Sequence, residues 1–241
     1  MMRKLKSEEH APGGADWIDP IGSDETSTSS VASAARFDVC PTWLDLAIRH
    51  LSDAGAAQVS RVAEYRGADG IAQIEMLKWE FEASLQAIVC CGIAVQAFGA
   101  VIQSKIQLPQ SITDEWQRQG TPQHIQISEV LRRAFDLDAK NASGVRQCLG
   151  EILRFHDLAI DPSQKSGTTV FHPGLSTAVE WRFAYFRFEN ASLIVRATLR
   201  LIWELVALGK PSEENVQKYV DGLRPKVEPL QNSVALKEKR S

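Results

Sequence analysis

Residues 141–191 contain the stretch of the chain that decides the fold, and they read NASGVRQCLGEILRFHDLAIDPSQKSGTTVFHPGLSTAVEWRFAYFRFENA. Apolar residues at helical spacing run through the first part and stop before Asp161 and Pro162, a pair that is typical of a helix end. A long loop of small and polar residues follows, and a second helix, rich in aromatic residues and arginine, is expected to begin near Ser176. This pattern predicts a helical fold in which the other long segments pack against these two helices.

Helical periodicity extends on both sides of this stretch. We expect long helices at residues 41–65, 71–106, 127–137, 141–160, 176–208 and 212–223, and one short helix around Trp116. Asn141 is the expected N-cap of the helix that reaches residue 160. Alternation typical of strands extends over no more than a few residues. The sequence therefore predicts an all-α fold, an up-and-down bundle of four to five main helices.

The expected helix at 71–106 has one apolar stripe that includes Gly92 and Gly99. Glycine lowers helix stability, so we expect these two positions to allow a neighbouring helix to approach closely. The unbroken apolar run covers only residues 87–95, which is shorter than the roughly 20 residues of a membrane span. The pattern predicts a buried bundle helix and no membrane association.

The two ends of the chain differ in composition from its middle. Residues 1–37 have few large apolar side chains, so they cannot offset the entropy of ordering, and we expect a disordered tail. Residues 38–224 are expected to form a single helical domain. Residues 225–241 are charged and are expected to form a flexible C-terminal tail.

Composition limits the classes of function. The 241 residues carry a net charge of -3 and a pI near 6.0, which argues against duplex DNA as a ligand but leaves RNA in a local cleft possible. The four cysteines form no C-x-x-C pair, which argues against a structural zinc site and favours a reducing compartment. No secretory signal is visible, so we expect a cytoplasmic protein. We also expect the protein to bind no cofactor and no metal.

The segment LRFHDLAIDP at residues 153–162 carries a family resemblance, together with SLQAIVCCGIAVQAFGAVI at residues 84–102 and the aromatic helix that follows. In outline, residues 70–208 resemble the HEPN (higher eukaryotes and prokaryotes nucleotide-binding) superfamily. The resemblance implies a small helical bundle that forms homodimers. It also implies a metal-independent ribonuclease of a toxin–antitoxin or phage-defence system, whose signature is an Arg followed after four to six residues by a His.

This chain departs from the signature. With four intervening residues, His156 occupies the place of the arginine and Asp161 the place of the histidine; with six, Arg154 is the arginine but Asp161 again ends the motif. An aspartate is an anion at neutral pH and cannot donate the proton. Arg154 and His156 also lie about 200° apart around the helix, so they cannot face one cleft. We expect a degenerate motif and, in first place, no catalysis.

Each residue of the motif has a structural alternative. His156 is either a general base or a polar residue that is hydrogen-bonded within the bundle. Asp161 is either functional or a helix stop. In a rearranged catalytic site, Arg154, His156 and Asp161 would act together, with Arg187 as a further candidate member.

Three further residues are candidates for binding. Glu180 and Arg187 fall on the apolar side of the expected helix at 176–208, so each needs a partner. Arg187 would pair with Asp161 or Asp157, or both charges would line a dimer interface. His172 is the third candidate, and the spacing of the histidines does not demand a metal site. The aromatic residues of this helix would either pack in the core or stack on bases.

Three functions remain open at this stage. The first is a catalytically degenerate binding and regulatory module, related to RNA, nucleotides or defence. The second is an active metal-independent endoribonuclease with a rearranged site. The third is a structural protein that binds a partner protein and has no connection with RNA.

Overall fold

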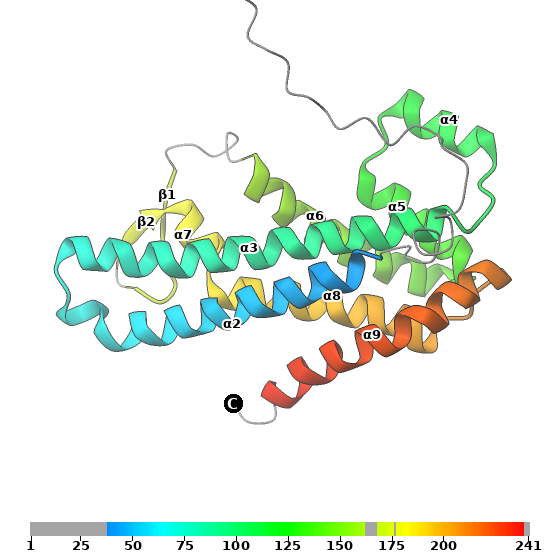
Figure 1. Ribbon diagram of the computed structural model, residues 1–241. Helices are drawn as coiled ribbons and strands as arrows, with labels where there is room; N and C mark the ends of the chain where they lie inside the picture. Colours follow the sequence, from blue (N-terminus) through cyan, green and yellow to red (C-terminus); the bar gives the residue numbers. More distant parts are fainter. Residues whose placement is uncertain (1–37, 162–167, 176, 239–241) are drawn as a thin grey trace, which may run out of the picture. The chain divides into compact units, whose positions relative to one another are not determined.

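The computed structural model describes residues 38–161, 168–175 and 177–238, and the expected N-terminal tail at 1–37 lies outside this part. The described part is an all-α bundle with one two-stranded sheet, which confirms the predicted fold class (Figure 1). Its elements are α2 (Cys40–Glu64), a 3-10 turn (Tyr65–Gly67), α3 (Gly70–Gln103), α4 (Gln110–Gln119), α5 (Gln123–Ala134), α6 (Ala139–Ile160), β1 (Thr169–Phe171), β2 (Ala178–Glu180), α7 (Trp181–Tyr185), α8 (Phe188–Leu208) and α9 (Glu214–Glu238).

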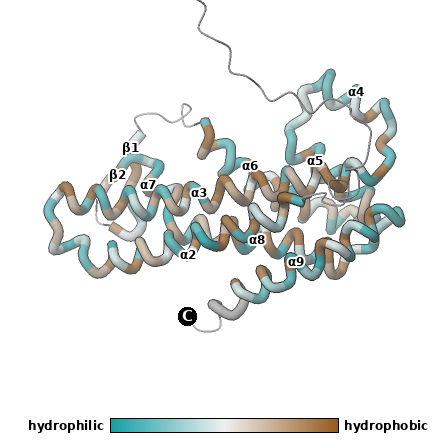
Figure 2. Tube along the Cα trace, viewed as in Figure 1, coloured by the Kyte–Doolittle hydropathy of each residue, from teal (hydrophilic) through white to brown (hydrophobic). Residues whose placement is uncertain are grey.

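Helices α2 and α3 form an antiparallel hairpin, and they lie side by side in Figure 1. The break between them falls at residues 65–69, between the expected helices at 41–65 and 71–106. Asp69 caps α3, because its Oδ1 accepts hydrogen bonds from the backbone N–H groups of Ile71 and Ala72 at 3.1 and 2.9 Å. The short helix expected around Trp116 is α4, which has no buried residues and is largely hydrophilic in Figure 2.

Helix α3 is the central element, because it contacts α2, α5, α6 and α8. Both glycines of its apolar stripe have the expected role. A Cβ at Gly92 would overlap the ring of His156 on α6, and a Cβ at Gly99 would lie 2.9 Å from Cγ2 of Ile127 on α5. By length and composition α3 is able to cross a membrane, but 56% of its most apolar window is buried against the rest of the fold, as in the core helix of a bundle.

Helix α6 ends where the sequence predicts and begins earlier. Asp161 follows its last residue, and the backbone N–H of Asp161 donates to the carbonyl oxygen of Asp157 at 2.9 Å. The expected cap at Asn141 is wrong, because Asp138 caps the helix by accepting a hydrogen bond from the N–H of Asn141 at 2.8 Å. Helix α5 likewise lies a few residues before its expected position at 127–137.

The single helix expected at 176–208 is wrong. Thr169–Phe171 and Ala178–Glu180 pair as antiparallel strands, and α7 and α8 are separate helices. The chain breaks between α7 and α8 because Glu80 of α3 accepts a hydrogen bond from the N–H of Phe188 through Oε1 at 3.0 Å, which fixes a new helix start. Asn190 closes the junction by donating from Nδ2 to the carbonyl oxygen of Tyr185.

The flexible tail expected from residue 225 is wrong as far as residue 238, because α9 continues to Glu238. Its buried face repeats at helical spacing through Val216, Val220, Leu223 and Val227. Two prolines, at 225 and 229, lie inside the helix and are exposed, so they do not interrupt that buried face. Packing of the face outweighs the tendency of proline to end a helix.

Candidate functional site

Arg154 lies on the exposed side of α6. Its Nη2 is 2.7 Å from Oε2 of Glu151, one turn earlier on the helix, and its guanidinium lies 4.6 Å from the centre of the Phe155 ring. Both contacts are local to α6, so they hold Arg154 along the surface of the helix.

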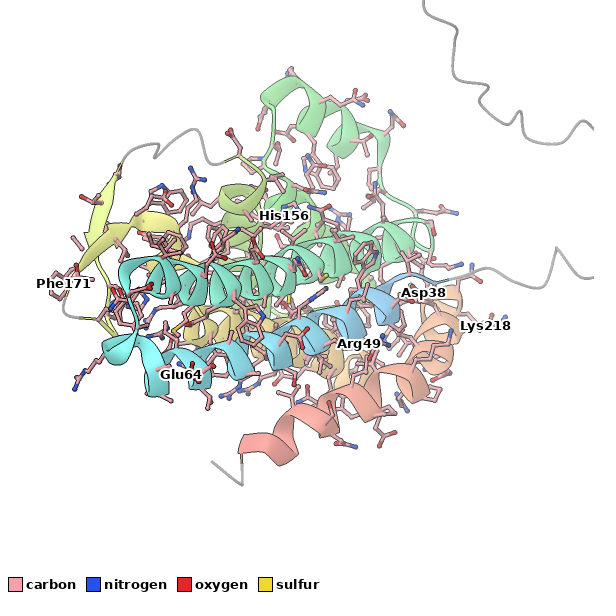
Figure 3. The ribbon with its side chains drawn as sticks, turned by 60° about the vertical axis from the view of Figure 1, so that its left-hand side comes forward. Asp38, Arg49, Glu64, His156, Phe171 and Lys218 are labelled. Atoms are coloured by element: carbon pink, nitrogen blue, oxygen red, sulfur yellow. The ribbon has the colours of Figure 1, made fainter. Side chains whose placement is uncertain are left out.

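His156 lies on the opposite side of α6 and is 7% exposed. Its ring rests on Gly92 of α3, and its Nδ1 is 3.1 Å from Oδ1 of the neighbouring Asp157. Figure 3 shows His156 on α6 beside α3. The divergence of Arg154 and His156 that the spacing predicts is therefore present, and His156 is enclosed by the bundle instead of facing a substrate.

Arg154 borders a cavity of about 650 Å³ between α5 and α6. His124 of α5 borders the same cavity, together with Glu151 and Asp157. An imidazole beside a guanidinium can exchange a proton next to a bound anion, whereas two carboxylates repel that anion. His124 could not be recognised from the sequence, because it lies on another helix and no local pattern connects it with Arg154.

A buried ion pair joins α2 to α3. Nε of Arg61 lies 2.5 Å from Oε2 of Glu80, and both side chains are 3% exposed. Glu80 also caps α8 through its second oxygen, as described above. Charges so deeply buried are stable only when they are paired and hydrogen-bonded, and Glu80 meets both needs at once. Neither residue was predicted from the sequence, although Glu80 falls three residues after the buried Leu77.

His172 lies beside this ion pair, in the connection between β1 and β2, and is 1% exposed. Its Nδ1 accepts a hydrogen bond from the N–H of Gly174 at 3.0 Å, so the ring proton of the neutral form is on Nε2. In the described part of the chain, Nε2 has no hydrogen-bond partner. Burial, and then the charge of Arg61, lowers the pKa of His172.

Arg187 and Glu180 have partners close to them in the sequence. Nη1 of Arg187 is 3.2 Å from Oε2 of Glu189, so the carboxylate that Arg187 contacts is neither Asp157 nor Asp161. Glu189 also accepts a hydrogen bond from Nε2 of Gln58 on α2 at 2.6 Å. Glu180 lies 3.0 Å from Nε of Arg182. The Gln58–Glu189 hydrogen bond attaches the start of α8 to α2, and the other two contacts stay within residues 180–189.

A groove runs between α6 and α8 on another part of the surface. One hollow of about 630 Å³ and a second of about 310 Å³ share Gly144, Cys148 and Ala197. The groove extends along α8 from Ile194 to Leu208. Its lining is mainly apolar, and its small side chains leave space for a bulky group from another molecule.

The structure does not bring the sequence-predicted site residues into one cluster. Arg154 faces the cavity with His124, His156 packs on α3, and His172 belongs to the Arg61–Glu80 cluster. Within residues 38–161, 168–175 and 177–238, no group of three or more His, Cys, Asp or Glu side chains is placed to hold a metal ion. No family model, no curated protein and no solved structure matches this chain.

Proposed function

We propose that the protein is a non-catalytic binding and regulatory module that acts as a homodimer in the cytoplasm. The observation that carries the proposal is the placement of His156: it packs on Gly92 inside the bundle, away from Arg154. A buried imidazole on the far side of the helix cannot exchange protons with a ligand that Arg154 holds. The apolar groove between α6 and α8 offers a surface for binding that does not involve the altered motif.

The relationship to the HEPN superfamily is part of this proposal. Its support is the long apolar helix α3 packed against α6, with the altered motif Arg154–Asp161 at the end of α6. An RNA-related or defence setting follows from that resemblance. The cytoplasmic location is supported by four free cysteines, three of them buried, as expected in a reducing compartment.

A second function, metal-independent cleavage of RNA, is favoured by the cavity that Arg154 shares with His124. In this alternative His124 would exchange the proton and Arg154 would bind the phosphate. Glu151 and Asp157 border the same cavity, and their negative charges oppose phosphate binding. We place cleavage second for that reason.

Incubation of the pure protein with end-labelled RNA at neutral pH, without divalent metal, separates the two functions. We expect intact RNA at the end of the incubation. Cleavage that disappears in both His124→Ala and Arg154→Ala would overturn the non-catalytic proposal. The matched control is His50→Ala, which removes a half-buried histidine of α2 and should leave any such cleavage unchanged.

A further inference from the structure

The exposed side of α8 beside the groove carries a stripe of apolar and charged side chains. Leu193, Arg196, Arg200, Glu204 and Leu208 follow one another at intervals of three or four residues, so they form one stripe along the helix. All five are exposed, with Leu193 at 65% and Leu208 at 76%. A large apolar side chain therefore lies at each end of the stripe, and charged side chains lie between them.

The stripe of one α8 is complementary to the stripe of a second α8 that runs antiparallel to it. An antiparallel copy of α8 related by a two-fold axis near Arg200 brings Leu193 opposite the partner's Leu208. It also brings Arg196 opposite the partner's Glu204. Each contact occurs twice, as a two-fold interface requires. The stripe thus pairs leucine with leucine and positive charge with negative charge across the axis.

The charges nearest the axis are also compatible with this arrangement. Arg200 would lie near the partner's Arg200, but each guanidinium already lies 2.7 Å from Oε1 of its own Glu204. Each glutamate would then contact its own Arg200 and the partner's Arg196, so the two glutamates are shared among four arginines.

The groove provides the depth that close packing of helices needs. Ile194 and Leu208 are fourteen positions apart, or about 21 Å at 1.5 Å per residue, which is close to four helical turns. Gly144, Cys148 and Ala197 are small residues, and a Cβ built at Gly144 would meet no atom within 4 Å beyond its own stretch of helix. Space of this kind lets a partner's α8 approach closely near the middle of the stripe.

We propose that two copies of this chain associate through α8, packed antiparallel about a two-fold axis near Arg200, with each copy covering the other's α6–α8 groove. The inference rests on the proposed function, of which the homodimer is a part. It adds the surface and the residue pairs that hold it.

Charge reversal tests the inference in the full chain by sedimentation velocity at several protein concentrations. Arg196→Glu and Glu204→Arg should each raise the dimer dissociation constant by about tenfold or more, because each creates two like-charge contacts per dimer. The double variant R196E/E204R restores opposite charges across the axis and should restore association. Leu208→Asp should weaken association both in the wild type and in R196E/E204R.

The matched control is Lys218→Glu on α9, an exposed basic residue that lies away from α8 in the sequence and is paired with Glu214 one turn earlier. It should leave the dissociation constant unchanged. Circular dichroism shows whether each variant retains its helix content, and all the substituted side chains are exposed.

Cys148 gives a second measurement that does not depend on a substitution. It lines the groove and is half-buried, whereas Cys40, Cys90 and Cys91 are buried. Its rate of modification by a thiol reagent should fall as protein concentration rises through the dimerisation range. In Arg196→Glu the rate should stay constant over that range.

The outcomes separate the inference from the proposal on which it rests. A wild-type protein that is monomeric at every concentration overturns both. A wild-type dimer that all the α8 variants leave intact overturns the inference alone, and the homodimer then uses another surface. Loss of the dimer in both single reversals and its recovery in R196E/E204R support the inference.

Discussion

Two regions of the bundle use their polar and small residues in opposite ways. Around α3, buried polar side chains pack between neighbouring helices: Arg61 pairs with Glu80, and His156 rests on Gly92. Between α6 and α8, small residues line an open groove, and the charged side chains stand at its edge. We call the first the packed region and the second the open groove. The comparison shows that residue types typical of active sites are structural in the packed region, whereas the open groove is lined mainly by apolar residues.

The largest effect is expected from breaking the packed region at Glu80. Glu80→Ala leaves Arg61 buried without its carboxylate and removes the cap of α8, so the free energy of unfolding should fall by about 3–5 kcal/mol. Urea denaturation followed by circular dichroism measures this change. The control, Glu75→Ala on the exposed side of the same helix, should cost less than about 0.5 kcal/mol. Equal losses would show that the buried ion pair has no special role.

Gly92→Ala should produce the next largest effect in the packed region. The new methyl group would overlap the ring of His156, and overpacking of this kind lowers stability by about 1–3 kcal/mol. The same denaturation experiment tests it. The double variant Gly92→Ala with His156→Ala should recover part of the loss, because the smaller side chain on α6 makes room. A Gly92→Ala variant with the same free energy of unfolding as the wild type would contradict the close contact between α3 and α6.

A smaller effect is expected from pH, through His172. Burial and Arg61 lower its pKa in the folded state, so between that value and about 6.5 the unfolded chain binds more protons. Stability should therefore fall as pH drops below about 6.5, by at most roughly 1.4 kcal/mol per pH unit from this group. Glu80 and Glu189 oppose the shift, and Arg187 adds to it.

Comparison of the wild type with His172→Asn isolates this contribution. The asparagine oxygen can accept the hydrogen bond from Gly174, but the side chain does not titrate. The slope of unfolding free energy against pH below about 6.5 should be smaller in the variant. Identical slopes would exclude His172 as the source of the acid sensitivity.

The smallest effect, with the opposite sign, is expected in the open groove. Gly144→Ala should stabilise the fold by about 0.5–1 kcal/mol, because alanine favours the helix and nothing lies near the new methyl group. The same methyl group narrows the groove, so the dimer dissociation constant should rise. Thermal unfolding and sedimentation measure the two changes separately. A destabilised Gly144→Ala protein would mean that this part of the groove is already filled.

The helices could be predicted where apolar residues at helical spacing mark one buried face. Gly92 and Gly99 indicated close packing from α3 alone, because a costly residue on a buried face requires a packing reason. The prediction failed for the helix at 176–208 because a residue of α3 determines where α8 begins. Glu80 accepts a hydrogen bond from the N–H of Phe188, and no sequence pattern near Phe188 indicates that bond. Strands of three residues are also too short to show alternation.

The sites were less predictable than the fold, for a physical reason. Arg154 and His156 could be separated by helix geometry alone, because they share one helix. The neighbours of each came from other helices: His124 beside Arg154, and Gly92 beside His156. In α9, the charged composition from residue 225 suggested a tail, although the spacing from Leu223 to Val227 continues the buried face.

Glu80 also has a consequence for the order in which the chain assembles. It pairs with Arg61 only 19 residues away, but it caps Phe188 across a separation of 108 residues. Contacts of short separation form sooner, because less of the chain must be constrained to close them. During synthesis the α2–α3 hairpin emerges well before α8 and can orient the carboxylate through Arg61. The first turn of α8 then finds its cap already in position, so the earliest part of the bundle sets where its later helix begins.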